Sequence, residues 1–546
     1  MNSPDYTSLV PHYTFADTLA EQETQLTQNP LMERMVESRA EKASDPHRPI
    51  YHYVNPENLL NDPNGLCFWQ GRWHLFYQGT PPEDPRPHWG HTVSDDLIHW
   101  RDLPYAIYPN PEESCFSGGT LVEDDRVIAI YHGTQVGNMV AVSSDPLLLN
   151  WEKLTGQAVI PIPEQDGSPQ PYTVFDPCIW KKDDAYYSLS AGALPDGPGG
   201  QRVAADFLFR SVDLKNWEYL HPFIEEDRYT LVGDDGACPY FLPIGDRHIL
   251  PFFSHMSGGQ YLLGDYDKAR DKLVVTSGGR FNFGAFGPSG VHAPSAAPDG
   301  QGGVIVIFNM NPGFPTEGWN QIMTLPRRLT LAGDDVLRME PVGDIESLRY
   351  DHKRIEGMEL PANQELVLEG IVGNAMELNL EIEPENSPMV ELTVLRSPNR
   401  EEHTRIAFFK DRGFRVQYPS TQPGAVLASG DPVVGRHGQP RPTQFHESLL
   451  TLDTSYSSTL PDALSRAPET APLLLEPGEP LRLRVFIDRS VVEVFANGKQ
   501  CVAARVYPGR EDSTGISIRA QGDNARLVSL DAWQMKDIYA KEASPG

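Results

Sequence analysis

The chain has 546 residues, enough for about two to four domains, and its 10% aromatic content predicts packed globular cores rather than disorder. The formal net charge of −30 argues against nucleic acids and anionic membranes as partners, because both bind through basic patches. No apolar run of about 20 residues and no signal-peptide pattern is present, so we expect a cytoplasmic protein, or a secreted one if a leader once preceded position 1.

Residues 1–48 are expected to form a short helical N-terminal extension. From Phe15 to Lys42, Glu, Gln, Leu, Met and Ala recur at helical spacing, and Pro30 interrupts the pattern. We therefore expect two short surface helices ahead of the first large domain.

A strand-like motif recurs five times within residues 49–345, with starts roughly 50–60 residues apart. Each copy is rich in β-branched or aromatic residues and follows Gly or Asp turn residues, as strands do. The copies are Trp73–Gln78, Arg126–His132, Ala185–Ser190, Arg247–Phe253 and Gly302–Phe308. One such unit cannot bury both of its faces, so the repeat predicts blades stacked around an axis and favours a five-bladed β-propeller over a β-sandwich with chance similarity.

Residues 346–546 show a different pattern. Apolar and polar residues alternate in Met376–Ile382, Leu481–Ile487 and Val491–Phe495, which predicts an antiparallel β-sandwich. The stretch from about Ser420 to Pro480 is rich in Pro, Ser and Thr and is predicted to be a long loop region. The expected fold class is therefore all-β, a five-bladed propeller followed by a C-terminal sandwich.

Acidic residues precede three of the repeated strands at similar offsets. They lie in Asn61-Asp-Pro-Asn-Gly65, Phe175-Asp-Pro-Cys178 and Asp234-Asp-Gly-Ala-Cys-Pro239. The strand before each repeated strand should be the innermost of its blade, so these carboxylates should converge at one end of the central channel. Paired carboxylates at close range are what glycoside hydrolysis needs.

The cysteines give no sign of a disulfide framework or a metal site. They are widely spaced, odd in number and without a Cys-x-x-Cys pair, which favours core packing. They are Cys67, Cys115, Cys178, Cys238 and Cys501.

Taken together, these segments resemble glycoside hydrolase family 32, which includes invertases, inulinases and levanases. The resemblance rests on the Asn61–Gly65 opening and on a set of later segments, Trp73–Gln78, Trp89-Gly-His-Thr-Val-Ser94, Phe116-Ser-Gly118, Leu325–Leu331 and Ser490–Phe495. It spans roughly residues 50–535. It implies a retaining mechanism on β-fructofuranosyl substrates, with a carbohydrate as the partner, no metal and no organic cofactor, and it leaves a homo-oligomer possible.

The resemblance also assigns roles to residues. Asp62 matches the nucleophile, and its polar, turn-rich surroundings should keep its pKa low. Asp176 matches the acidic residue that binds fructose hydroxyls and stabilises the transition state. The expected substrate-binding residues are Asn61, Gln78, Trp89, Phe116, Ser117, Phe175 and Asp234. For Trp89, blade packing is the alternative to a sugar contact.

Two positions depart from the family pattern. Phe175 stands where the family usually has Arg, and Ala237 stands where it has the Glu that acts as general acid and base. Residues two apart on a strand face the same side, so Asp235 is the replacement acid that we favour. Asp234 would point away unless Gly236 forms a bulge. His255 and Glu113 are weaker candidates.

Two classes of function follow from these features. The first is a retaining fructosidase or fructosyltransferase acting on sucrose, fructans or related fructosides, which the intact Asp62 and Asp176 favour. The second is a catalytically impaired fructan-binding protein, which the missing Glu favours. A related furanosidase acting on arabinofuranosides is a third option, and the opening motif and the terminal sandwich argue against it.

Overall fold

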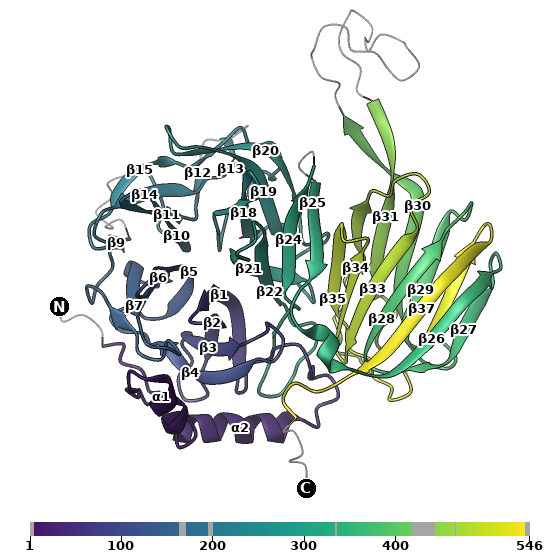
Figure 1. Cartoon of the computed structure of the whole chain (residues 1–546), viewed down its shortest axis with the longest axis horizontal. Coiled ribbons are helices and arrows are strands. Elements are labelled where there is room, and N and C mark those ends of the chain that lie inside the picture. The colour runs from purple at the N-terminus through teal and green to yellow at the C-terminus, as the bar shows by residue number, and fades with distance from the viewer. Residues whose placement is uncertain are drawn as a thin grey trace, which may run out of the picture.

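The computed structural model describes residues 5–162, 171–194, 200–201, 203–333, 336–417, 443–464 and 466–540. Over these ranges nearly all regular structure is β-strand, and the α-helices lie near the N-terminus. Figure 1 shows blades arranged around an axis in one half of the molecule and two stacked sheets in the other. The predicted all-β fold, a five-bladed propeller followed by a β-sandwich, is confirmed.

Each propeller blade is built from consecutive strands of the chain. Around the axis, the first strand of the second blade contacts those of the first and third, and the first strand of the fifth blade contacts those of the first and fourth (Figure 1). In the described residues the main strands are, blade by blade, β1 Leu59–Trp69, β2 Arg72–Thr80, β3 His88–Ser94 and β4 Arg101–Ile107; β5 Cys115–Val122, β6 Val127–Gly133, β7 Gly137–Ser143 and β8 Glu152–Lys153; β10 Pro177–Lys182, β11 Ala185–Ser190, β14 Phe207–Ser211 and β15 Glu218–Pro222; β17 Leu242–Ile244, β18 Arg247–Ser254, β19 Gly258–Asp267 and β20 Lys272–Arg280; and β21 Val291–Pro298, β22 Val304–Met310, β24 Arg327–Ala332 and β25 Val336–Pro341. Short strands at the blade edges are β9 Ile160–Pro161, β12 Ala193–Leu194, β13 Val203–Ala204, β16 Ile224–Glu225 and β23 Ile322–Met323.

The repeated sequence motif is the second strand of each blade. Each copy falls on β2, β6, β11, β18 or β22, and each of these strands pairs antiparallel with the first strand of its blade. Every residue of β6 and β22 is buried. A middle strand of a blade is covered on both faces by the neighbouring blades, which explains why the motif is an apolar run rather than an alternation.

The sandwich consists of two antiparallel sheets over the described residues. In sheet order they contain β26 Arg349–Leu360, β37 Ala525–Met535, β28 Ala375–Glu383, β33 Leu481–Asp488, β34 Val491–Ala496 and β35 Gln500–Arg505, and β27 Glu365–Val372, β36 Gly515–Gln521, β29 Met389–Arg396, β30 Thr404–Gln417, β31 Thr443–Asp453 and β32 Glu469–Leu473. Their facing sides form one core, in which Leu378, Val485 and Ile518 are fully buried.

The prediction of a long loop from about Ser420 to Pro480 is wrong where the structure can be compared with it. β31 and β32 lie within it and pair antiparallel. Residues 418–442 and 465 lie outside the described residues. The many Pro, Ser and Thr residues concealed the short apolar alternation of Ser448–Asp453, because turn-forming residues on both sides dominate the local composition.

Propeller and sandwich meet at a fully buried cluster of charged residues. Glu493 on β34 accepts hydrogen bonds from Arg327 Nη2 at 2.8 Å and from the Leu325 backbone N–H at 2.7 Å. His52 Nε2 lies 3.2 Å from Glu493, and its Nδ1 lies 2.9 Å from Asp488. The Leu325–Leu331 and Ser490–Phe495 segments, singled out in the sequence, therefore join the two domains at this cluster.

The segments just before the first blade and just after the last strand of the sandwich also meet at this junction. The backbone N–H of Ile538 donates to the Ile50 carbonyl at 3.0 Å, and the Val54 N–H donates to the Tyr539 hydroxyl at 3.3 Å. The Arg39 guanidinium lies 3.9 Å from the centre of the Tyr539 ring. A short 3₁₀ helix, η2 Ile345–Leu348, links β25 to β26.

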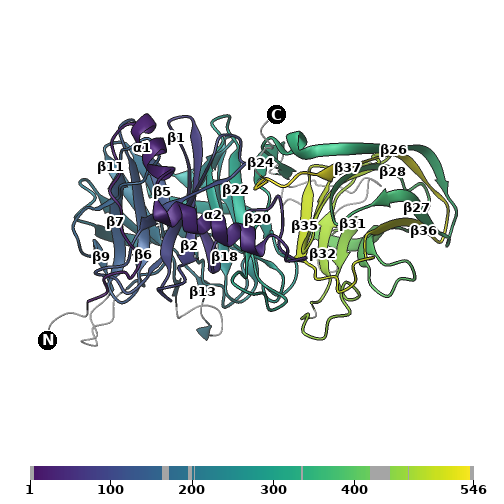
Figure 2. The same ribbon diagram turned by 90° about the horizontal axis from the view of Figure 1, so that it is seen from below.

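The N-terminal extension contains the two predicted helices, α1 Leu19–Leu26 and α2 Pro30–Lys42. Asn29 caps α2 by accepting hydrogen bonds from the Leu31 and Met32 N–H groups, and Pro30 occupies the first turn, where a missing N–H costs least. Figure 2 shows α2 lying across the outside of the propeller. The extension is fixed there by the bonds of Gln22 to Asp145 and of Arg39 to Asp102.

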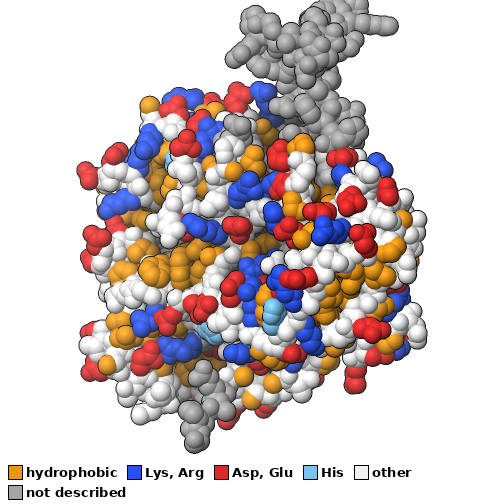
Figure 3. All heavy atoms as spheres, turned by 45° about the vertical axis from the view of Figure 1, so that its right-hand side comes forward, with side chains coloured by type: hydrophobic (Ala, Val, Ile, Leu, Met, Phe, Trp, Pro, Cys, Tyr) orange, Lys and Arg blue, Asp and Glu red, His pale blue; other side chains and the backbone are white. Residues whose placement is uncertain are grey.

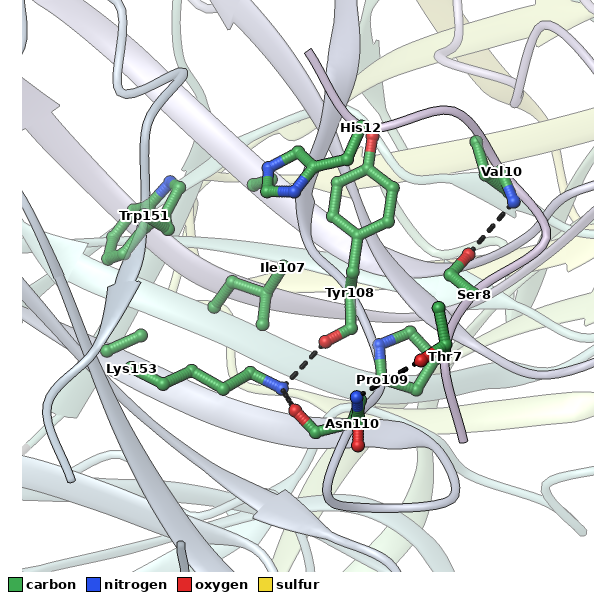
Figure 4. Close-up of a pocket in the computed structure, with 12 residues that line it drawn as sticks. Thr7, Ser8, Val10, His12, Ile107, Tyr108, Pro109, Asn110, Trp151 and Lys153 are labelled. Atoms are coloured by element: carbon green, nitrogen blue, oxygen red, sulfur yellow. Dashed lines mark hydrogen bonds between the residues drawn. The ribbon is translucent and has the colours of Figure 1, made fainter. Parts of the chain in front are cut away.

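A cavity of about 300 Å³ lies between this extension and the first two blades (Figure 4). The His12 ring lies 4.4 Å from the Tyr108 ring and is tilted against it by 32°, and Lys153 donates hydrogen bonds to the carbonyls of Tyr108 and Asn110 at 2.7 Å each. The acidic residues of the propeller axis do not line this cavity.

The surface mixes charges of both signs. Figure 3 shows acidic and basic side chains interspersed with small apolar areas over the face that it presents. Among the described helices, none is long and apolar enough to cross a membrane.

Candidate active site

The innermost strand of the first blade is irregular where it carries Asp62. The pairing of β1 with β2 shifts register between Leu60 and Pro63 and again between Asn64 and Cys67. Gly65 has φ +51°, and a Cβ there would lie 2.7 Å from Thr120. Bulges of this kind redirect side chains, and here the irregular stretch places the Asp62 carboxylate among polar groups of neighbouring strands.

Asp62 is nearly buried and surrounded by donors. Its Oδ2 accepts hydrogen bonds from Ser117 Oγ at 2.7 Å and from Gln78 Nε2 at 3.1 Å. Its Oδ1 lies 3.0 Å from His292 Nδ1, close but poorly aligned for a hydrogen bond. Burial acts to raise the pKa of Asp62, but His292 and Ser117 outweigh it and hold this pKa below its usual value. Asp62 is therefore a charged carboxylate at neutral pH.

Asp176 lies beside it, in the turn before β10. Its Oδ2 accepts a hydrogen bond from the Cys238 backbone N–H at 3.1 Å and lies 3.3 Å from Cys238 Sγ. Burial, and then the charge of Asp62, raises the pKa of Asp176 to about 7. The structure thus brings the two predicted carboxylates together, one with a lowered pKa and the other with a pKa raised to about 7.

Cys238 links the two carboxylates, a role that the sequence analysis missed. Its Sγ lies 3.7 Å from Asp62 Oδ2 as well as close to Asp176. All five cysteines of the chain are buried and free, as core packing predicts. In the sequence, the one sign of this role is that Cys238 follows Ala237, which differs from the family pattern.

Three of the predicted sugar-binding polar residues lie at Asp62. Ser117 and Gln78 bond to it directly, and Gln78 Nε2 also lies 2.7 Å from Ser117 Oγ. Asn61 donates to Gln78 Oε1 at 3.3 Å and accepts from Gln321 Nε2 at 2.9 Å. These amides and the hydroxyl form one connected network around the carboxylate.

The expectation that Trp89 offers a flat face to the sugar is corrected by its burial. Its indole is 0% exposed and packs against Phe76 and Tyr131 in the core of the first two blades. Its Nε1 donates to the Phe116 carbonyl at 2.9 Å. Trp89 therefore supports the strand that carries Phe116 and Ser117 rather than lining the site, because blade packing encloses it on both faces.

The two positions that depart from the family pattern form an apolar cluster. Ala237 is 0% exposed and packs with Cys238, Phe253 and Ala293, and the half-buried Phe175 and Phe286 lie against this group. The space beside Ala237 is thus occupied by aromatic side chains. Phe175, like the half-buried Phe116, lies at the border of the acidic centre.

The two candidate acids before Ala237 have different surroundings. Asp234 is fully buried and accepts hydrogen bonds from the Leu231 N–H and from the side chains of Ser254, Ser257 and Gln260. Asp235 is partly exposed and binds His255 instead, with 2.7 Å between its Oδ2 and His255 Nδ1.

The alternation argument that singled out Asp235 does not apply to this backbone. Gly236 has φ +62° and Cys238 has φ +51°, and Ala237 forms an isolated bridge with Phe253 on β18 rather than part of a regular strand. Asp235 stays a candidate through its bond to His255, and Asp234 has a structural environment. Glu113 lies in the second blade, where its backbone N–H bonds to Thr134.

His292 is a neighbour of Asp62 that the sequence did not predict. It comes from β21, and its Nδ1 also lies 3.1 Å from Asn309 Nδ2. The fifth blade carries His292, and no Asp, at the place where the first and third blades carry Asp62 and Asp176, so a pattern of carboxylates does not reveal it, whereas a pattern of titratable residues on the first strands does.

Comparisons with known proteins agree with this geometry. Residues 52–341 match the glycosyl hydrolases family 32 N-terminal domain, and residues 344–534 match the family 32 C-terminal domain. The chain is 27% identical over 538 residues to a levanase from Bacillus subtilis, covering 90% of this chain and 71% of that protein. It is 29% identical over 533 residues to a sucrose-6-phosphate hydrolase from Escherichia coli, covering 91% and 96%.

Among solved structures, fructan 1-exohydrolase IIa from Cichorium intybus has the same fold, with a TM-score of 0.72, 22% identity and coverage of 90% of this chain and 98% of that one. The two family domains match almost the whole propeller and sandwich. The chain therefore belongs to glycosyl hydrolase family 32.

Proposed function

We propose that this chain is a retaining glycosidase that cleaves or transfers β-fructofuranosyl units, with Asp62 as nucleophile and Asp176 as stabiliser of the transition state. The observation that carries the proposal is the pair of carboxylates at the axis, one held ionised by His292 and Ser117 and the other with a pKa raised to about 7. Two carboxyl groups whose environments push their pKa values apart are suited to different tasks in one reaction.

The environment of Asp62 fits nucleophilic attack. Gln78 and Ser117 hold Oδ2, while Oδ1 is buried and makes no well-aligned hydrogen bond among the described residues. Oδ1 is therefore the oxygen that we assign to the bond with the anomeric carbon. His292, 3.0 Å away, keeps that oxygen ionised before the attack.

Asp176 fits the second role. Its Oδ2 is held by the Cys238 backbone N–H, which orients the carboxyl group. A carboxyl group so placed can bond to vicinal sugar hydroxyls, and these bonds strengthen as the furanose ring flattens in the transition state. The neighbouring aromatic side chains of Phe116 and Phe175 offer apolar faces for the CH groups of sugar rings.

The test is a product analysis. The purified chain is incubated with sucrose, inulin, levan and difructose compounds, and products are followed by chromatography and by NMR. We expect release or transfer of fructose, with the β-anomer formed first, because a nucleophile-type pair gives net retention. An α-anomer as first product contradicts the mechanism. Binding of fructans without any product from any substrate favours instead the catalytically impaired binding protein.

Hydrolysis and transfer are separated in the same experiment. Raising the fructan concentration tenfold increases the ratio of longer products to free fructose for a transferase and leaves it near zero for a hydrolase. Asp62→Asn is the control, because it should stop both outcomes.

A further inference from the structure

The leaving oxygen of a fructoside needs a proton, and the position where family 32 carries its acid cannot supply one. Ala237 has no titratable group, and Phe175 beside it has none either. Asp234 is fully occupied by four donors. Asp206, which a Cβ on Gly236 would approach to 2.8 Å, is 0% exposed and therefore inaccessible to a sugar.

His255 is the titratable side chain that borders this altered region. It follows β18, and its Nδ1 lies 2.7 Å from Asp235 Oδ2 while its backbone N–H donates to Asp235 Oδ1 at 3.2 Å. Its side chain is 51% exposed, and within the described residues its Nε2 has no hydrogen-bond partner. The Asp235 contact therefore fixes the ring through one nitrogen and leaves the other available.

The ring of His255 packs against aromatic side chains that lie next to Asp62 and Asp176. Its centroid is 6.3 Å from that of Phe175, the residue before Asp176, and 5.1 Å from that of Phe253. Phe253 in turn lies 4.0 Å from the ring of His292, which contacts Asp62. His255 is thus a half-exposed group at the border of the acidic centre, on the side where Ala237 replaces the acid.

The charges facing His255 favour its protonated form. They are Asp235 in the segment before Ala237, Asp176 before β10 and Asp62 on β1. The hydrogen bond to Asp235 is the largest cause that raises the pKa of His255. Burial and the charge of Asp235 raise the pKa of Asp206 well above its usual value, so that group stays neutral.

We propose that His255 is the acid and base of this site, with Asp235 as a positioning residue that acts through it. The inference rests on the proposed fructosidase function. In this site, an imidazolium that is held by a carboxylate takes the place of the carboxylic acid. An imidazolium is suited to this task, because histidine changes its charge near neutral pH.

The chemistry balances in two steps. In the first, Asp62 Oδ1 forms a bond to the anomeric carbon, the bond from that carbon to the leaving oxygen breaks, and the Nε2 proton of His255 moves to that oxygen. In the second, the neutral Nε2 takes a proton from water or from an acceptor hydroxyl. The oxygen so activated bonds to the anomeric carbon, and the electron pair of the Asp62 ester bond returns to the carboxylate.

The experiment uses the dependence on the leaving group. His255→Ala is assayed with the natural fructoside that the wild type cleaves and with 4-nitrophenyl β-fructofuranoside, whose leaving group departs without a proton. We expect a loss of about 10²–10⁴-fold in kcat/KM on the natural fructoside and less than about tenfold on the aryl fructoside. Added imidazole should restore part of the activity on the natural substrate.

His99→Ala is the matched control. His99 is also half-exposed at 45%, and its Nδ1 also lies 2.7 Å from a carboxylate, that of Asp96, on the outer part of the first blade. It should change neither substrate's kinetics. Thermal unfolding of all variants shows whether any loss of activity is a loss of folded protein.

Asp235→Asn tests the positioning role through the pH profile. Without the carboxylate, the imidazolium gives up its proton more easily, so the basic limb of kcat/KM should move down by about one pH unit. A drop in activity at every pH with no movement of this limb contradicts the role of Asp235.

The remaining outcomes separate this inference from the function on which it rests. Equal losses on both substrates in His255→Ala, or no loss on either, overturn His255 as the acid while the fructosidase stands. Failure of the wild type to cleave either fructoside overturns the proposed function and this inference together. Asp62→Asn should lose both substrates alike.

Discussion

Two buried clusters in this molecule each combine a histidine with two carboxylates, and they differ in how many of these carboxylates contact the histidine. At the junction of propeller and sandwich, His52 contacts both Asp488 and Glu493. At the propeller axis, His292 contacts Asp62, while Asp176 has the N–H and thiol of Cys238 as its partners. In the first cluster both carboxylates contact a histidine. In the second only Asp62 does, and Asp176 bonds to Cys238 instead.

The pKa directions express this difference. Burial would lower the pKa of His52, but Asp488 and Glu493 outweigh it and raise this pKa to about 8. Burial opposes ionisation of Glu493 too, yet the charge of Arg327 and the contact with His52 hold its pKa below the usual value. At the axis, burial and Asp62 raise the pKa of Asp176 to about 7. Both carboxylates of the junction cluster thus contact a basic side chain, whereas the described hydrogen-bond partners of Asp176 at the axis are the N–H and thiol of Cys238.

The largest effect expected from this comparison is on activity. Asp62→Asn should lower kcat/KM by about 10⁴-fold, because it removes the nucleophile while keeping the shape and the hydrogen-bond capacity of the side chain. Kinetics and thermal unfolding are measured together. If the unfolding temperature falls along with the activity, Asp62 belongs with the junction residues and the contrast between the clusters is lost.

The converse holds for Glu493→Gln at the junction. Removing this charge leaves Arg327 buried without its carboxylate, so the free energy of unfolding should fall by about 3–5 kcal/mol. Urea unfolding measures the loss, and the specific activity of the folded protein should stay within about twofold. A loss of stability below about 1 kcal/mol would mean that the cluster is not what joins the domains.

His52 should make the stability of the junction depend on pH. Its pKa is raised to about 8 from the ordinary histidine value of 6.5, so its stabilising contribution is complete below about pH 6.5 and is lost as the pH rises through about 8. The expected loss is about 2 kcal/mol, because one pKa unit corresponds to about 1.4 kcal/mol. Urea midpoints from pH 6 to pH 9 reveal the step, and its survival in His52→Gln would assign it to another group.

The smallest expected effect is on the stability of the axial cluster, and its sign is opposite to that expected for the junction. The raised pKa of Asp176 destabilises the folded wild type progressively as the pH rises from about 4 to about 7. Asp176→Asn does not titrate, so it should be more stable than the wild type at pH 8, by about 1 kcal/mol or more, and equal to it near pH 4. Activity is lost at both. A variant less stable at pH 8 would place Asp176 among the structural carboxylates.

The sequence predicts the fold where the chain repeats itself, and it predicts site residues where a motif lies within one turn. Periodic apolar runs identified the second strand of every blade, because burial on both faces leaves a plain compositional signal. The Asp62 and Asp176 turns were found because each lies immediately before or within a first strand, and the propeller then brings first strands together.

The remaining features of the site depend on local backbone conformation and on packing. The direction of Asp235 depends on positive φ values at Gly236 and Cys238, which no alternation rule anticipates. Trp89 looks the same in sequence whether it faces a sugar or a neighbouring blade. His292 approaches Asp62 only because the ring closes, 230 residues later in the chain, and such a contact has no local signature.

That closure has a consequence for how the protein is made. Over the described residues each blade is built from strands that follow one another in the chain, and residues 50–54, ahead of the first blade, bond to Ile538 and Tyr539 after the last strand of the sandwich. At about 5–20 residues per second, ribosomal synthesis separates these two segments by roughly half a minute to two minutes. During that interval the blades can form one after another as they emerge, while residues 50–54 lack their partners Ile538 and Tyr539. The contacts between these two segments can therefore form only after Tyr539 has been synthesised, when all five blades already precede it in the chain.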